Sequence, residues 1–146
     1  MNLRTRIEIP YIDNLHYLGI GSVIKAELEF EPVIGTYTDQ SDLPTNLEMY
    51  LVNNKNQNFG QMSLVGSSDK AYAVLHYNKE FKDETYYSFD ITKYLVDEYL
   101  DLGDPVYSLL MTLPQSTING NINQLIIGDK NHPTSKMKLK VYLATY

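Results

Sequence analysis

The stretch Ile24-Lys25-Ala26-Glu27-Leu28-Glu29-Phe30 decides the fold class of this chain. Apolar and charged residues alternate in it at every step. Because successive side chains of a β-strand point to opposite faces of the sheet, this alternation predicts a strand with one face on a core and the other in water. Ile24 and Phe30 mark the two ends of the predicted inward face.

Comparable segments recur along the chain at intervals of roughly ten residues, bounded by Gly, Pro, Asn and Asp. Further strands are predicted at 3–9, 47–52, 61–65, 71–77, 86–89, 106–113, 123–127 and 137–143. One α-helix is expected at about residues 91–102, between a capping Asp90 and the breakers Gly103 and Pro105, together with a short helical turn near 12–18. Strands without regular βαβ alternation predict an all-β fold, an antiparallel β-sandwich of jelly-roll type, as a single domain over residues 1–146.

Composition excludes several functional classes. The chain has 146 residues and no cysteine, which removes disulfides, Cys-ligated zinc, iron–sulfur clusters and thiol nucleophiles. Eighteen acidic residues against 12 basic ones give a net charge of −6, which argues against a nucleic-acid partner. No run of apolar residues is long enough to predict a membrane-spanning segment.

No catalytic or metal-binding motif is present in the sequence. Nucleophile elbows, phosphate loops, paired-histidine helices and calcium loops are all missing, and His16, His76 and His132 are far apart along the chain. We therefore expect no enzymatic activity, no cofactor and no metal. The many carboxylates leave open a hydrolase with paired acids, and the loop around Asp39 and Asp42 leaves open a calcium ion.

Tyrosine supplies the candidate binding residues, because the chain has 13 Tyr against 4 Phe and no Trp. Tyr37, Tyr50, Tyr72 and Tyr87 fall in predicted loops or on predicted polar faces, and exposed aromatic rings are common platforms for sugars and peptides. We take Tyr37, Tyr50 and Tyr72 as the candidate ligand-binding site. The alternative is that tyrosine replaces Phe and Trp at the rim of the sandwich, with its hydroxyl in water.

The order of several segments resembles a known family. These segments are the strand Val23-Ile24-Lys25-Ala26-Glu27-Leu28, the run Tyr87-Ser88-Phe89-Asp90-Ile91-Thr92-Lys93-Tyr94 and the closing Lys138-Leu139-Lys140-Val141-Tyr142. Together they resemble the carboxy-terminal part of the Bacteroidetes lipoproteins grouped as domain of unknown function 4270. They are also similar to the DNRLRE type of carbohydrate-binding-like jelly rolls.

The resemblance implies a context more than a reaction. It implies an extracytoplasmic domain, on the cell surface or outer membrane, within a longer lipoprotein whose lipid-bearing cysteine lies upstream. It therefore favours a binding or accessory module whose partner is a glycan or an envelope protein. A structural spacer between the lipid anchor and another domain is the alternative that remains beside the hydrolase.

Overall fold

The computed structural model describes residues 4–11, 14, 23–100, 107–114 and 125–144, and eight strands lie within them. The strands are β1 (Thr5–Ile7), β2 (Val23–Phe30), β3 (Asn46–Val52), β4 (Asn58–Gln61), β5 (Tyr72–His76), β6 (Tyr86–Asp90), β7 (Ser108–Thr112) and β8 (Lys138–Leu143). Two 3-10 turns, η1 (Gln40–Asp42) and η2 (Lys82–Glu84), and the helix α2 (Thr92–Leu100) complete the described elements. The expected turn near 12–18 falls on residues 12–13 and 15–18, outside the described part of the chain.

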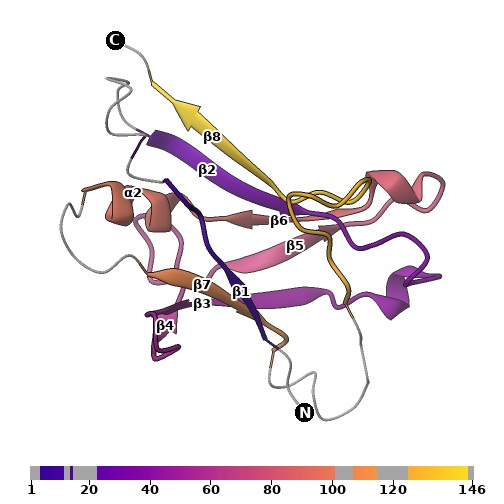
Figure 1. Cartoon of the computed structure of the whole chain (residues 1–146), viewed down its shortest axis with the longest axis horizontal. Helices are drawn as coiled ribbons and strands as arrows, with labels where there is room; N and C mark the ends of the chain where they lie inside the picture. The colour runs from indigo at the N-terminus through magenta and orange to yellow at the C-terminus, as the bar shows by residue number, and fades with distance from the viewer. Residues whose placement is uncertain (1–3, 12–13, 15–22, 101–106, 115–124, 145–146) are drawn as a thin grey trace.

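The strands form one curled antiparallel sheet in the order β1-β7-β3-β5-β6-β2-β8, with β4 added beside β3. The sheet bends so far that its two halves face one another, as the opposed β7–β3 and β2–β8 regions in Figure 1 show. The expected all-β antiparallel fold of sandwich type is therefore confirmed. Its two layers belong to a single half-barrel whose edges are β1 and β8.

The core fills the space inside the curl. It contains the inward side chains of every long strand, among them Leu28, Met49 and Leu109, each at most 2% exposed. β7 lies between β1 and β3 and buries residues on both of its faces. Removal of these side chains from water is the main force that holds the curl together.

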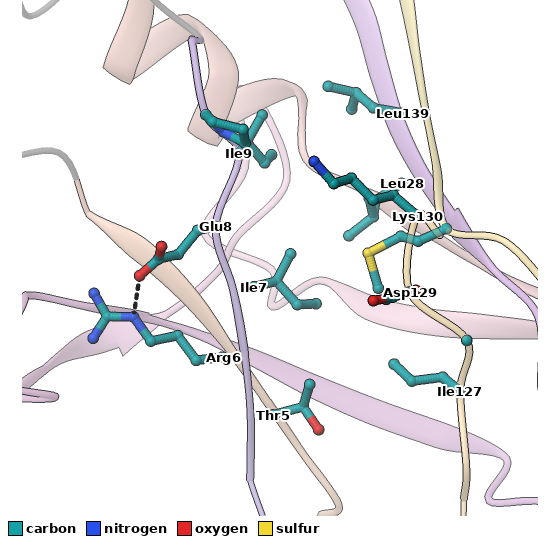
Figure 2. Close-up of a pocket in the computed structure, with 13 residues that line it drawn as sticks. Thr5, Arg6, Ile7, Glu8, Ile9, Leu28, Ile127, Asp129, Lys130 and Leu139 are labelled. Carbon is teal, nitrogen blue, oxygen red and sulfur yellow. Dashed lines mark hydrogen bonds and ion pairs between the residues drawn. The ribbon is translucent and has the colours of Figure 1, made fainter. Parts of the chain in front are cut away.

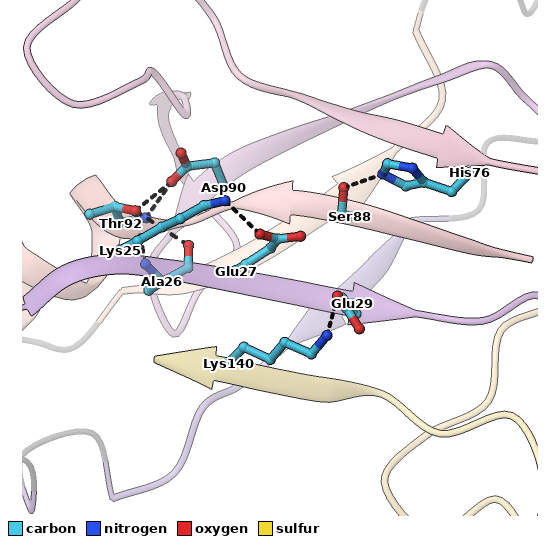
Figure 3. Close-up of polar contacts among 9 residues, drawn as sticks. All are labelled: Lys25, Ala26, Glu27, Glu29, His76, Ser88, Asp90, Thr92 and Lys140. Atoms are coloured by element: carbon cyan, nitrogen blue, oxygen red, sulfur yellow. Dashed lines mark hydrogen bonds and ion pairs between the residues drawn. The ribbon is translucent and has the colours of Figure 1, made fainter. Parts of the chain in front are cut away.

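Helix α2 covers one end of the core and begins where β6 ends. The Asp90 carboxylate accepts a hydrogen bond from the Thr92 backbone N–H at 2.9 Å, the capping role expected for it. The buried Thr92 hydroxyl accepts the Ala26 N–H, also at 2.9 Å. This side chain therefore binds the first turn of α2 to β2 (Figure 3).

Three sequence predictions are wrong in detail. Ile24 points outward and is 64% exposed, because the β2–β8 register shifts between Val23 and Lys25 and leaves Ile24 as an extra residue. The strand expected at 61–65 lies earlier, at 58–61, within the Asn-rich segment. No strand forms at 125–127, where Ile127 makes only an isolated bridge to Pro32.

Candidate functional site

The three candidate tyrosines do not form one patch. Tyr37 is only 4% exposed, and its hydroxyl donates a hydrogen bond to the Lys82 carbonyl at 3.1 Å. Burial raises the pKa of the Tyr37 hydroxyl above its usual value, so the group stays protonated and acts as a structural donor. The expectation of an exposed ring at Tyr37 is therefore wrong, and the same holds for Tyr87, which is fully buried.

Tyr50 and Tyr72 come together on the outer face of the sheet. Leu47 and Met49 of β3 point into the core, so Glu48 and Tyr50 point outward. Tyr72 of β5 lies directly opposite Glu48, which makes Tyr50 its diagonal neighbour at about 7–8 Å. Tyr72 is 44% exposed and offers an open ring beside Tyr50.

A carboxylate organises this pair of tyrosines. The Tyr50 hydroxyl donates to Glu48 Oε2 at 2.9 Å, and this hydrogen bond raises the Tyr50 pKa. The phenol therefore remains a neutral donor while the second carboxylate oxygen of Glu48 can accept hydrogen bonds. We call Glu48, Tyr50 and Tyr72 the tyrosine cluster.

Ion pairs occupy the other half of the same outer face, on β2 and β8 (Figure 3). Lys25 lies 2.8 Å from Glu27, and Lys140 lies 2.6 Å from Glu29. In each case the glutamate raises the pKa of the lysine ammonium. The glutamates on β2, expected on a solvated face, are thus partly buried and already neutralised, which does not favour them as a catalytic acid pair.

His76 and Ser88 form a contact that sequence spacing did not indicate. The ring nitrogen Nε2 of His76 lies 2.8 Å from Ser88 Oγ, and the ring stacks on Tyr86 with a centroid separation of 4.5 Å. A serine nucleophile would also need a group that orients the imidazole and donors for the oxyanion. Among the described hydrogen bonds, Ser88 is the partner of the His76 ring, and the contact joins the paired strands β5 and β6.

The Asp42 carboxylate, in the loop considered as a calcium site, already accepts hydrogen bonds from neighbouring residues of the same loop. Its Oδ2 accepts hydrogen bonds from the Thr38 N–H, the Thr38 hydroxyl and the Asp39 N–H, at 2.8, 2.6 and 3.0 Å. These donors lower the Asp42 pKa to about 2. Within the described residues no group of three or more metal-ligating side chains is present.

Titration of Asp42 should therefore make the free energy of unfolding depend on pH under acidic conditions. The folded pKa of about 2 lies below the ordinary value of 3.8, so the stabilisation is complete above pH 4 and is lost as pH falls toward 2. NMR titration of the carboxyl carbon should give the low pKa directly. In Asp42→Asn this part of the acid-dependent loss should disappear, and a normal pKa at Asp42 would contradict the prediction.

A cleft lies where the sheet fails to close, between the edge strand β1 and the segment 127–130 (Figure 2). Its volume is about 460 Å³. One wall is formed by residues 5–10 and the other by residues 127–130, while Leu28, Met137 and Leu139 supply the floor. Volume and apolar floor are typical of small-ligand sites, and nothing in the local sequence pattern indicated it.

No helix among the described residues has the length and apolar character needed to cross a bilayer. Comparison with known proteins adds no assignment. No protein-family model matches the sequence, and neither a curated protein nor a solved structure is significantly similar to it. The fold and the two surfaces described above are therefore the basis for any function.

Proposed function

We propose that this chain is a non-catalytic binding module of an exported lipoprotein and that it binds a neutral glycan at the tyrosine cluster. The observation that carries the proposal is the open Tyr72 ring beside the hydrogen-bonded pair Tyr50–Glu48. An aromatic face packs against the C–H face of a sugar ring, and adjacent hydroxyl and carboxylate groups bind the sugar hydroxyls. The resemblance to lipoproteins and carbohydrate-binding-like jelly rolls favours the same function and a surface location.

Charge narrows the class of glycan. The chain carries a net charge of −6, and the cluster itself contains the carboxylate of Glu48. An anionic polysaccharide would be repelled by both. A neutral plant or host polysaccharide fits the surface better.

The test is a glycan array followed by titration of the best ligand. We expect Tyr72→Ala to weaken binding about tenfold or more, because an aromatic stacking contact and its buried area are lost together. Tyr50→Phe should weaken it by a smaller factor, since only one hydroxyl is removed. Tyr142→Ala is the matched control, because Tyr142 is similarly exposed, at 50%, but lies on β8 at the sheet edge.

Three outcomes would contradict the proposal in different ways. Equal loss in Tyr72→Ala and Tyr142→Ala would show that the cluster is not the site. Retention of an envelope protein with no glycan bound would replace the sugar by a protein partner. Absence of any ligand, in the array and in thermal-shift screening, would favour the structural spacer.

A further inference from the structure

The cleft between β1 and residues 127–130 leaves apolar side chains of the inner face uncovered. Leu28 and Leu139 are paired across β2 and β8 and face the same interior, yet Leu28 is 2% exposed and Leu139 is 37% exposed. Ile9, Ile127 and Met137 around the cleft are also only partly buried. Within the described part of the chain no side chain covers the interior at this point, and an apolar ligand would supply the missing cover.

The charged side chains around the cleft differ in whether they already have a partner. Figure 2 shows Glu8 and Arg6 paired on the side of β1 that points away from the cleft, with Arg6 Nε 2.8 Å from the carboxylate. Asp129 is held in its turn, where Oδ1 accepts the Asn131 N–H at 2.8 Å. The Lys130 side chain instead extends across the opening toward Ile9, as Figure 2 shows.

Lys130 has no ion-pair or hydrogen-bond partner among the described side chains. A lone ammonium at the mouth of an apolar cleft attracts a single negative charge. The carboxylate of Asp129, on the same segment, would disfavour a second negative charge on the ligand. Charge and apolar surface together define a ligand with one anionic head and an apolar tail.

We infer that the cleft binds a monomeric monocarboxylate amphiphile of the fatty-acid class. Its carboxylate pairs with Lys130, and its chain lies along Ile7, Leu28 and Leu139. This site is separate from the tyrosine cluster, because Tyr72 lies on the outer face of β5 and the cleft opens to the inner face between β1 and β8. The two proposals can therefore fail independently.

The test compares two probes of equal chain length and opposite charge, dodecanoate and dodecylammonium, by calorimetric titration below their micelle concentrations. We expect the protein to bind dodecanoate and to bind dodecylammonium at least tenfold more weakly. Lys130→Gln should weaken dodecanoate binding about tenfold, since a charge-assisted contact is lost. Lys70→Gln makes the same change in net charge at an exposed residue that does not line the cleft and should leave the affinity unchanged.

A second variant tests the apolar part of the site. Leu139→Trp places a bulky indole ring in the cleft and should abolish dodecanoate binding. An unchanged thermal transition of this variant shows that its fold is intact. Equal binding of the two probes, or an equal effect of Lys130→Gln and Lys70→Gln, would overturn the role of Lys130. No binding of dodecanoate to the wild-type protein would overturn the whole inference, as would binding only to anionic lipid vesicles.

Discussion

Replacing Tyr87 with alanine is expected to lower the free energy of unfolding by about 3–5 kcal/mol, the usual cost of truncating a buried aromatic ring. Tyr87 is 0% exposed and stacks on Phe30 with a centroid separation of 5.3 Å and an interplanar angle of 13°. Its hydroxyl donates to the Pro44 carbonyl at 2.7 Å. Truncation would therefore leave a cavity and an unpaired carbonyl in the centre of the core.

Two further variants separate these contributions in urea unfolding. Tyr87→Phe keeps the ring but leaves the Pro44 carbonyl unpaired, so about 1–2 kcal/mol should be lost. Tyr142→Ala, at an exposed edge position, should change stability by less than about 0.5 kcal/mol. If Tyr87→Ala were no more destabilising than Tyr142→Ala, the assignment of Tyr87 to the core would be incorrect.

Burial also gives Tyr87 an effect at high pH. It raises the Tyr87 pKa well above the ordinary value of 10.0, so the folded protein keeps the phenol protonated where the unfolded chain ionises. The stabilisation from this group is complete below pH 10 and declines as pH rises further. Tyr87→Phe should lack this part of the alkaline loss of stability.

The fold class could be predicted because it depends on local patterns. Alternation in Ile24–Phe30 identified β2, and the junction of Phe89, Asp90 and Thr92 identified the start of α2. Such signals depend on the side-chain period of a strand and on helix capping, both of which are properties of short segments.

Positions decided by pairing between strands could not be predicted in the same way. Ile24 fits the alternation and still points outward, because a bulge leaves it unpaired between Val23 and Lys25. This bulge belongs to the pairing of β2 with β8 and not to the sequence of β2 alone. Tyr37 and Tyr87 could not be distinguished from Tyr72 by residue type, since tyrosine has both an apolar ring and a polar hydroxyl that finds a partner when buried. In the fold, the hydroxyls of these two buried tyrosines donate to the carbonyls of Lys82 and Pro44, which lie more than 40 residues away along the chain.

The two candidate surfaces also differ in how far the sequence could predict them. Two of the three residues of the tyrosine cluster, Tyr50 and Tyr72, were predicted from the sequence, whereas Glu48 was found only from the pairing of β3 with β5. The cleft could not be predicted from the sequence, because its walls come from opposite ends of the chain. Its shape depends on a sheet that curls without closing. Lys130 in a polar turn gave no signal of a ligand contact.

Gly128, in the wall of that cleft, is the position where the smallest substitution should have a large effect. A methyl group added there would overlap the Ser135 carbonyl oxygen and would lie 2.8 Å from His132 Cβ. Neither neighbour can easily move, because His132 Nδ1 accepts the Ser135 N–H at 2.9 Å and Ser135 is 1% exposed. We expect Gly128→Ala to cost about 3 kcal/mol, at the upper end of the range for overpacking.

Gly66→Ala provides the comparison for this effect. Gly66 has a φ of +70° and open space around it, so its substitution costs only backbone strain, about 1–2 kcal/mol. Urea unfolding should therefore rank Gly128→Ala as the more destabilising variant. Since residues 128–130 form one wall of the cleft, Gly128→Ala should also weaken dodecanoate binding, whereas Gly66→Ala should not. Equal stability of the two variants would mean that the 128–135 loop yields freely, and such a loop could not hold Lys130 in place over the cleft.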